Sequence, residues 1–237
     1  ETSVPIGCSH RPSRRAFLAS AGAIAAAGAA GIAPVQGQGS ATPQTLKVGS
    51  IGISVISDGV FTQPTSVMLP GRPETEVAAL FERQGSKFRG LEAETNVVVL
   101  RTGGEIILVD AGAGPDFMPT LGRLADRLDG AGIKPETVTK VVFTHAHADH
   151  FWGASDPLGD GALFEKARHL MTAAERDFWL APDVEARVGD AFKSMAVGTH
   201  KRMKALAERI EIVKPQQEIV PGIVLIDTAG HSPGHVS

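Results

Sequence analysis

The sequence has 237 residues, of which 43% are hydrophobic and 21% are charged, a composition typical of a folded domain and not of a disordered chain. Its 23 basic and 26 acidic residues give a net charge of -3, and the basic residues are scattered, which argues against nucleic acid or an anionic membrane surface as a partner. A small-molecule substrate is therefore expected, and no pattern indicates an oligomeric state. The single cysteine, Cys8, cannot form an internal disulfide, so it does not indicate a redox compartment.

The amino terminus has the layout of an export signal. Arg14 and Arg15 precede a weakly apolar run rich in Ala and Gly at residues 16–33, and small polar residues follow. The adjacent arginines resemble a twin-arginine signal. Residues 1–40 are therefore interpreted as a twin-arginine-type signal peptide and linker, which predicts a periplasmic or secreted protein. Because a membrane span needs about 20 strongly apolar residues, no stable membrane anchor is expected.

The folded domain is expected to begin near Leu46. Residues 46–61 are rich in β-branched side chains interrupted by glycine, which predicts two strands joined by a tight turn. A long segment punctuated by Pro and Gly follows at residues 62–94, with one short helix expected at 76–84. Such a connection is either a lid that contacts substrate or a surface loop without function.

The rest of the domain combines strands and helices. Two apolar runs at 95–101 and 105–110 predict a hairpin, and leucines at helical spacing predict a helix at 117–130. The run at 138–144 is typical of a strand buried on both faces. The later patterns predict a strand at 167–172, helices at 173–180 and 190–210, and a final hairpin at 218–231. This order of elements predicts an α/β sandwich whose strand-end loops carry the functional site.

Directly after the buried strand, "THAHADH" at 144–150 contains three of the chain's 8 histidines. Residues two apart on an extended segment point the same way, so His145 and His147 can face one metal ion. Asp149 and His150 follow where the chain must turn, and they could hold a second cation, since paired catalytic metals lie about 3.5–4 Å apart. His and carboxylate ligands without a thiolate favour zinc, with iron or manganese as alternatives. A surface cluster without a metal is the competing interpretation.

A second informative stretch is "DTAGHSPGH" at 227–235, in which a predicted strand ends at a histidine preceded by glycine. His231 could complete a set of three histidines with His145 and His147, which leaves a fourth zinc position for water, as in catalytic sites. The remaining histidines of the domain are interpreted as local or structural residues: His169, His200 and His235. Asp58 is interpreted as a turn residue.

The stretch "THAHADH", with "LVDAG" upstream and "GHSPGH" downstream, resembles the metallo-β-lactamase fold superfamily, and its exported members similar to methyl parathion hydrolase and quorum-quenching lactonases in particular. The resemblance covers residues 46–237 and implies an αββα sandwich that binds one or two Zn²⁺ ions between two sheets. It implies the following metal ligands: His145, His147, Asp149, His150 and His231. Asp110 is implied to hydrogen-bond a ligand histidine and fix its tautomer, although closing a turn with Gly112 is an alternative role.

The implied activity is that of a zinc-dependent metallo-hydrolase, in which a metal-bound hydroxide attacks a small ester-like substrate such as a lactone, ester or phosphotriester. Asp149 would help to orient this hydroxide. Four side chains of the long connection are expected to offer apolar contacts to the substrate: Phe61, Met68, Leu69 and Phe88. The alternatives are a β-lactam or thioester hydrolase, an iron-dependent oxidoreductase of the same fold, and a non-catalytic metal-binding member.

The chain departs from the family pattern in two places. Phe151, Trp152 and Gly153 follow Asp-His where the family usually has x-Gly-Gly, so Trp152 either shapes the pocket or packs internally. Family members with two metals also have a bridging Asp and a further His downstream of the Gly-His motif, and the sequence ends at Ser237 before both. The chain is therefore interpreted as a C-terminally truncated domain whose second metal site keeps only Asp149 and His150.

Overall fold

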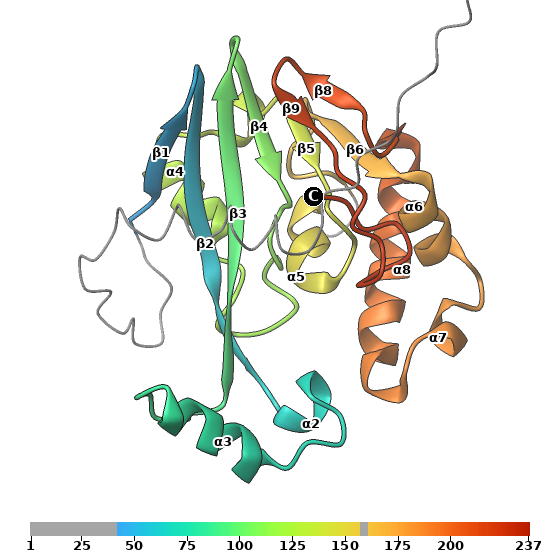
Figure 1. Ribbon diagram of the computed structural model, residues 1–237. Helices are drawn as coiled ribbons and strands as arrows, with labels where there is room; N and C mark the ends of the chain where they lie inside the picture. Colours follow the sequence, from blue (N-terminus) through green and yellow to red (C-terminus); the bar gives the residue numbers. More distant parts are fainter. Residues whose placement is uncertain (1–41, 157–160) are drawn as a thin grey trace, which may run out of the picture. The chain divides into compact units, whose positions relative to one another are not determined.

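The computed structural model describes residues 42–156 and 161–237, all within a unit that extends from Val35 to Ser237. The export signal expected in residues 1–40 lies outside the described residues. Seven strands form one sheet in chain order, and two further strands form a small second sheet (Figure 1). The α/β class predicted from the order of elements is confirmed.

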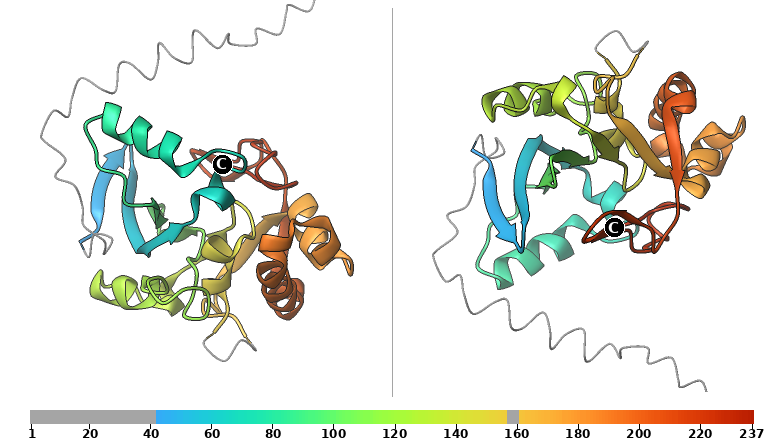
Figure 2. Two further views of the ribbon diagram at one scale, coloured as in Figure 1. Left: turned by 90° about the horizontal axis from the view of Figure 1, so that it is seen from below. Right: turned by 90° about the horizontal axis from the view of Figure 1, so that it is seen from above.

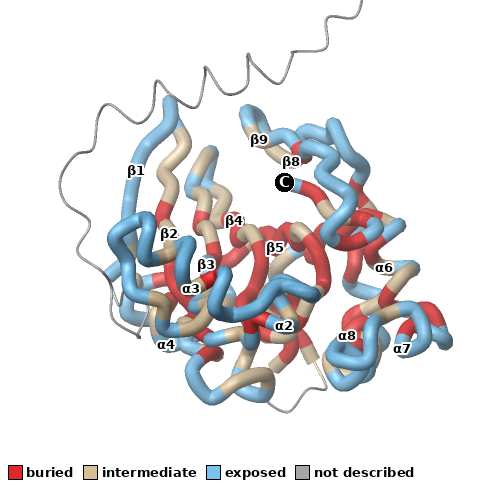
Figure 3. Tube along the Cα trace, turned by 60° about the horizontal axis from the view of Figure 1, so that its bottom comes forward, coloured by how far each residue is buried: buried red, intermediate tan, exposed pale blue. Residues whose placement is uncertain are grey.

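The first four strands of the large sheet are antiparallel neighbours: β1 (Gln44–Val48), β2 (Ile51–Gln63), β3 (Leu91–Thr102) and β4 (Glu105–Val109). Both predicted hairpins are confirmed. Gly103 and Gly104 join β3 to β4 with φ angles of 56° and 84°, a left-handed conformation that glycine adopts without a steric penalty. The edge strand β1 is exposed along its whole length, whereas buried residues concentrate in the middle of the sheet (Figure 3).

The other strands of the large sheet run parallel to β4: β5 (Lys140–Val142), β6 (Arg168–Thr172) and β7 (Ile210–Val213). The sequence patterns predicted β5 and β6 but assigned Ile210 to the end of a helix and left β7 out. In that short strand only Ile210 and Val213 are buried, so no apolar run marks it. Because the strands are parallel, the carboxyl ends of β4, β5 and β6 meet at one edge of the sheet, which carries the histidine motif (Figure 1).

Most of the predicted helices are present, with short 3₁₀ turns around them. The helices are α2 (Thr65–Met68), α3 (Glu74–Arg83), α4 (Leu124–Gly130), α5 (Ala148–Phe151), α6 (Ala173–Leu180), α7 (Val184–Arg187) and α8 (Lys193–Leu206). The 3₁₀ turns are η1 (Pro135–Thr137), η2 (Trp152–Ala154), η3 (Asp190–Phe192) and η4 (Ala207–Arg209). Within the described part of the chain, no helix has the length and apolar character needed to cross a membrane.

The two faces of the large sheet are covered differently. Alternate strand residues such as Leu108 and Val141 pack against α4, α5 and α8 in the largest apolar cluster. Their neighbours Ile107 and Val142 face the other way, toward β8 (Glu218–Val220) and β9 (Ile223–Val224). Two views show α4 and α8 on one side of the sheet, with α3 and the carboxyl-terminal segment on the other (Figure 2).

Two expectations about the segment before α4 are wrong. The helix predicted from residue 117 begins only at Leu124, and Asp58 is not a turn residue but lies at a β-bulge of β2. The Asp58 side chain is fully buried and accepts hydrogen bonds from the backbone N–H groups of Ala113 at 2.9 Å, Gly122 at 3.1 Å and Leu124 at 2.8 Å. These long-range bonds hold the segment before Leu124 in a non-helical path, in which Gly122 has a φ angle of 79°.

Candidate metal centre

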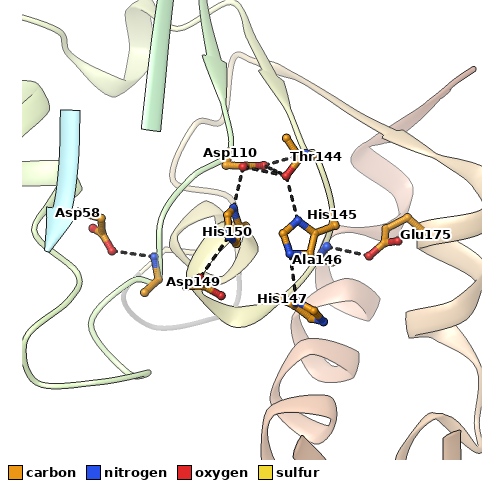
Figure 4. A network of polar contacts seen from close by, with 10 residues as sticks. Asp58, Asp110, Thr144, His145, Ala146, His147, Asp149, His150 and Glu175 are labelled. Atoms are coloured by element: carbon orange, nitrogen blue, oxygen red, sulfur yellow. Dashed lines mark hydrogen bonds and ion pairs between the residues drawn. The ribbon is translucent and has the colours of Figure 1, made fainter. Parts of the chain in front are cut away.

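The histidine motif begins where β5 ends. Phe143 is buried and contacts Phe151 of α5 edge to face at 5.0 Å, which anchors both ends of the motif. Between these two rings, the chain carries His145 and His147 toward the carboxyl edge of the sheet (Figure 4). The nearest ring nitrogens of the pair, His145 Nε2 and His147 Nδ1, lie 3.0 Å apart.

His231 approaches this pair from the loop after β9. Its ring centroid lies 4.8 Å from that of His145 and 4.7 Å from that of His147. One ligand nitrogen from each of the three residues lies within 4.8 Å of the others. The structure therefore brings together the three histidines that the sequence predicted as one set, and their exposure rises from buried His145 to exposed His231.

The protonation states of the first two histidines suit metal binding. Burial, together with the neighbouring histidines, lowers the pKa of His145 well below its ordinary value. Burial and the neighbouring His231 lower the pKa of His147 to about 4. Both imidazoles are therefore neutral at pH 7, and a neutral imidazole is the form that binds a metal ion.

The hydrogen bonds of Thr144 fix the tautomer of His145. The Thr144 hydroxyl lies 2.9 Å from Asp110 Oδ2 and 2.9 Å from His145 Nδ1. Its single proton goes to the carboxylate, which can only accept, so His145 Nδ1 must be the donor to the hydroxyl. The lone pair of neutral His145 is consequently on Nε2, the nitrogen that faces His147. A donor set of neutral imidazoles from two loops fits a divalent metal ion such as zinc.

Asp110 lies at the centre of a second group of contacts (Figure 4). Its carboxylate accepts a bond from the Thr144 backbone N–H at 2.8 Å and one from His150 Nδ1 at 2.8 Å. Asp110 itself has a φ angle of 67°, unusual for a residue other than glycine, and Gly112 follows with 72°. The carboxylate therefore bonds His150 directly and His145 through Thr144, while the backbone makes the turn, so both roles expected for Asp110 coexist.

Asp149 and His150 lie beside the three-histidine group and contact each other, with Asp149 Oδ2 and His150 Nε2 3.2 Å apart. Burial disfavours charge on His150, yet hydrogen bonds to Asp110 and Asp149 raise its pKa to about 10. Burial opposes ionisation of Asp149 as well, but the hydrogen bond from His150 lowers its pKa below the ordinary value. In the metal-free chain these two residues therefore form an ion pair at neutral pH, and the predicted second metal site stays a prediction.

The other histidines have separate environments. His235 Nδ1 lies 2.7 Å from Thr228 Oγ1, which confirms it as a local hydrogen-bonding residue, and its ring is also 4.9 Å from that of His145. His169 is fully buried in β6 and stacks on Phe143, and neither of its ring nitrogens has a partner among the described residues. His200 is half-buried and its Nδ1 bonds the Trp179 carbonyl of α6 at 2.7 Å, in agreement with a structural role.

Trp152 packs internally, one of the two roles considered for it. Its Nε1 donates to Thr199 Oγ1 at 2.8 Å, and the Arg202 guanidinium lies 4.1 Å from the ring centroid. The ring lies directly on Gly198 of α8, where an added Cβ would come within 2.3 Å of it. Phe117 contacts the indole edge to face at 5.5 Å.

Only part of the expected apolar substrate surface is free. Phe61 is buried and contacts Phe117, and Phe88 contacts Phe81 at 5.3 Å, so both rings serve internal packing. Met68 and Leu69 stay available, with 50% and 40% of their surface exposed. Met68 ends α2 and Leu69 follows it, and this helix lies at the same edge of the sheet as α5 (Figures 1 and 3).

Sequence reasoning missed one residue of this region, Glu175. It stands three positions after Thr172, a spacing typical of a capping box at a helix start. Thr172 does cap α6, since its hydroxyl accepts a bond from the Glu175 backbone N–H at 3.3 Å. The Glu175 side chain, however, turns to the backbone of the histidine motif, where its Oε1 accepts a bond from the Ala146 N–H at 2.9 Å (Figure 4).

Comparison with known proteins agrees with this geometry. An N-acyl homoserine lactonase of Bacillus cereus is 26% identical over 115 residues, which are 48% of this chain and 38% of the lactonase. The crystal structure of AbOPH, a hydrolase in the beta lactamase superfamily, superimposes with a TM-score of 0.71 at 26% identity over 86% of this chain and 69% of that one. AidC, a dizinc quorum-quenching lactonase in complex with a product, gives 0.74 at 19% identity over 82% of this chain and 68% of that one.

The chain thus spans well under half the length of its curated lactonase relative and about two thirds of the solved structures. The profile of the Metallo-beta-lactamase superfamily matches residues 92–237, a segment that includes β4, the histidine motif and His231. Because this match covers more than half of the sequence, the chain belongs to the metallo-β-lactamase superfamily.

Proposed function

We propose that the protein is a zinc-dependent hydrolase of small ester-like compounds, with a lactone as the first substrate class to test. The observation that carries the proposal is the convergence of His145, His147 and His231, whose ligand nitrogens lie within 4.8 Å of one another at the carboxyl edge of the sheet. Two similar proteins, an N-acyl homoserine lactonase and a dizinc lactonase bound to its product, support the same substrate class.

The three histidines would hold the first metal ion. A divalent metal at this position supplies a Lewis acid and lowers the pKa of water. His145 is ready for this role because Thr144 and Asp110 fix its ring so that Nε2 carries the lone pair. His147 is ready because its lowered pKa keeps it neutral. Asp149 and His150 are the proposed ligands of a second ion.

Asp149 is the proposed catalytic carboxylate. Its lowered pKa keeps it ionised at neutral pH, so it can accept a hydrogen bond from the attacking water and orient it. In the metal-free chain His150 Nε2 lies 3.2 Å from Asp149, and Asp110 holds His150 through the 2.8 Å contact to Nδ1. On binding a second ion, His150 would give up the proton on Nε2, while Asp110 would continue to fix the orientation of the His150 ring.

The substrate would contact the apolar surface of α2. Met68 and Leu69 are exposed there, and unbranched or flexible apolar side chains suit an acyl chain or another neutral group of variable shape. The net charge of -3 provides no broad basic surface for an acidic substrate. A neutral lactone or ester therefore fits this site better than an anionic compound.

The test is metal content and turnover in the whole protein, because the chain spans only part of its relatives. Elemental analysis should find zinc, and the protein should hydrolyse lactones faster than carboxylic esters, phosphotriesters, β-lactams or thioesters. Removing the metal with a chelator should abolish turnover, and added Zn²⁺ should restore it. Bound iron with oxygen consumption would instead identify an oxidoreductase, and bound metal without any turnover would identify a non-catalytic member.

A further inference from the structure

Glu175, in the first turn of α6, has a fully buried carboxylate. Four groups donate hydrogen bonds to it: Ala146 N at 2.9 Å, Trp179 Nε1 at 2.7 Å, Ser232 Oγ at 2.6 Å and Gly234 N at 3.0 Å. A buried carboxylate is costly unless its lone pairs are satisfied, and these bonds satisfy them. The need to satisfy a buried carboxylate does not explain why its donors come from these particular loops.

The two carboxylate oxygens bind the two loops that carry the proposed metal ligands. Oε1 accepts from the backbone of Ala146, the residue between His145 and His147. Oε2 accepts from Ser232, which directly follows His231, and from Gly234. Both loops are therefore fixed to a single planar group, so the geometry of that group sets how far His231 lies from the other two histidines.

The start of α6 holds the His231 loop from a second side as well. The Thr172 hydroxyl donates to the Gly234 carbonyl at 2.7 Å, while the Gly234 N–H donates to Glu175. An added Cβ on Gly234 would come within 2.2 Å of the Glu175 backbone nitrogen and 2.4 Å of Thr172 Oγ1. Only glycine allows this close approach, which shows that the loop and the helix start are fitted to each other.

The charge of Glu175 also acts on the site. None of its four donors is a cation, so hydrogen bonds alone offset the buried negative charge in the metal-free chain. That charge is near enough to His147 to favour its protonated form, although burial outweighs the effect. A divalent cation at the three histidines would be attracted by the same carboxylate through a medium of low dielectric constant.

We infer that Glu175 is a positioning residue of the metal centre, which joins the His145–His147 loop to the His231 loop and strengthens the binding of a divalent cation. The inference rests on the proposed metal-binding function. A purely structural carboxylate would contribute to stability alone. A positioning carboxylate must also change the affinity of the three histidines for metal, and this difference can be measured.

The experiment compares Glu175→Gln with Asp58→Asn in the whole protein. Asp58 is a matched control because it too is a fully buried carboxylate with backbone donors, and none of those donors belongs to the loops of His145, His147 or His231. Competition with a chromophoric chelator gives the Zn²⁺ dissociation constant, and denaturant unfolding of the metal-free protein gives stability. Glu175→Gln should weaken Zn²⁺ binding about 10- to 100-fold, the usual effect of a residue that orients metal ligands.

Asp58→Asn should lower stability and leave Zn²⁺ affinity within about twofold, since it touches no ligand loop. Should Glu175→Gln fail to fold, Ser232→Ala keeps the charge and removes one bond from Oε2, and it should weaken Zn²⁺ binding about three- to tenfold. Unchanged affinity in the folded Glu175→Gln protein, or in Ser232→Ala if that variant must stand in, would overturn the inference. A wild-type protein that binds no Zn²⁺ at all would instead refute the proposed function.

Discussion

The two ends of the same parallel strands differ in how their charges are paired. At the amino ends, Lys140 of β5 contacts Glu105 of β4 at 2.6 Å, and Arg168 of β6 contacts Glu211 of β7. Each charge there has a partner of opposite sign. At the carboxyl ends, Asp110 and Asp149 both contact the raised-pKa His150, whereas the hydrogen-bond donors of Glu175 are neutral (Figure 4).

This difference suggests that charges at the amino ends of the strands contribute to stability, whereas those at the carboxyl ends contribute to metal binding. The paired amino ends satisfy their charges within the chain, so they gain nothing from a ligand. The carboxyl ends carry an excess of negative charge and two neutral imidazoles, an arrangement that a divalent cation would complete. Changes at the two ends should therefore have different consequences, and the following variants test this from the largest expected effect to the smallest.

Replacing His147 by Ala should remove most of the bound metal and reduce turnover to that of the chelator-treated protein, because a site with two remaining histidines leaves most of the coordination sphere to water. Elemental analysis and a lactone assay measure both. His200→Ala is the matched control: it should keep the metal and lose only about 1 kcal/mol of stability, the bond to the Trp179 carbonyl. Equal metal loss in both variants would contradict the ligand assignment.

A buried histidine next to the amino-end pair of β6 sharpens the comparison. Burial and the charge of Arg209 lower the pKa of His169 to about 4 in the folded chain, whereas the unfolded chain has the ordinary value of about 6.5. The unfolded state therefore binds the proton first as the pH falls, so stability present above pH 6.5 is lost toward pH 4. The His169 contribution amounts to about 3 kcal/mol.

His169→Leu should remove this pH dependence, because a side chain of similar volume without ring nitrogens fills the same space in β6. Denaturant unfolding of metal-free protein at pH 8 and at pH 5 measures the change. The variant should gain stability relative to wild type as the pH falls, while its Zn²⁺ affinity at pH 8 stays unchanged. Parallel stability curves for the two proteins would show that His169 is not the titrating group.

Asp110→Asn perturbs the carboxyl ends of the strands without replacing a proposed metal ligand. The amide can no longer hold His150 through a charged bond, so metal affinity should fall about 10- to 100-fold. In the metal-free protein the pKa of His150 should fall from its raised value of about 10, as an NMR titration would show. An unchanged pKa would mean that Asp149 alone maintains the charge on His150.

The raised pKa of His150 also has a consequence for stability in the metal-free protein. Since the folded pKa lies above the unfolded value, the contribution is complete below about pH 6.5 and is lost as the pH rises through about 10. In Asp110→Asn, the free energy of unfolding should therefore fall less than in the wild type as the pH rises from about 6.5 to about 10.

Glu105→Gln removes the ion pair at the amino ends of β4 and β5. The variant leaves the buried Lys140 ammonium with a neutral partner, and stability should fall by about 1–2 kcal/mol in denaturant unfolding. Zn²⁺ affinity should not change, because the pair lies at the opposite end of β4 and β5 from the site. A reduced affinity would show that the two ends are coupled through the strands.

Sequence patterns predicted those parts of the structure that depend on neighbouring residues. The hairpin around Gly103 and Gly104 follows from two apolar runs and a glycine turn, and the convergence of His145 and His147 follows from their spacing. His231 was predicted because a strand was expected to end at a histidine preceded by glycine that could complete a three-histidine set, and the resemblance to a known family implied the same ligand. These inferences needed no knowledge of tertiary contacts.

The errors arise where a distant residue decides the local structure. Leu121, Leu124 and Leu128 have helical spacing, but Asp58, 64 positions before Gly122, accepts hydrogen bonds from backbone N–H groups at the start of the predicted helix. Glu175 looks like an ordinary capping residue because its partner Ser232 is 57 positions away. No pattern within a short window indicates either contact, so the sequence alone predicts the ligand loops but not the carboxylate that joins them.

The contact between Trp152 and Gly198 has a consequence for which substitutions the chain tolerates. The indole has room only because α8 carries no side chain at position 198. Any larger residue there would collide with the ring or displace it. The two positions are therefore coupled, and a side chain at 198 requires a smaller residue at 152. A substitution scan of α8 that keeps Trp152 would find position 198 intolerant even of alanine, although it lies far from the proposed metal ligands in the sequence.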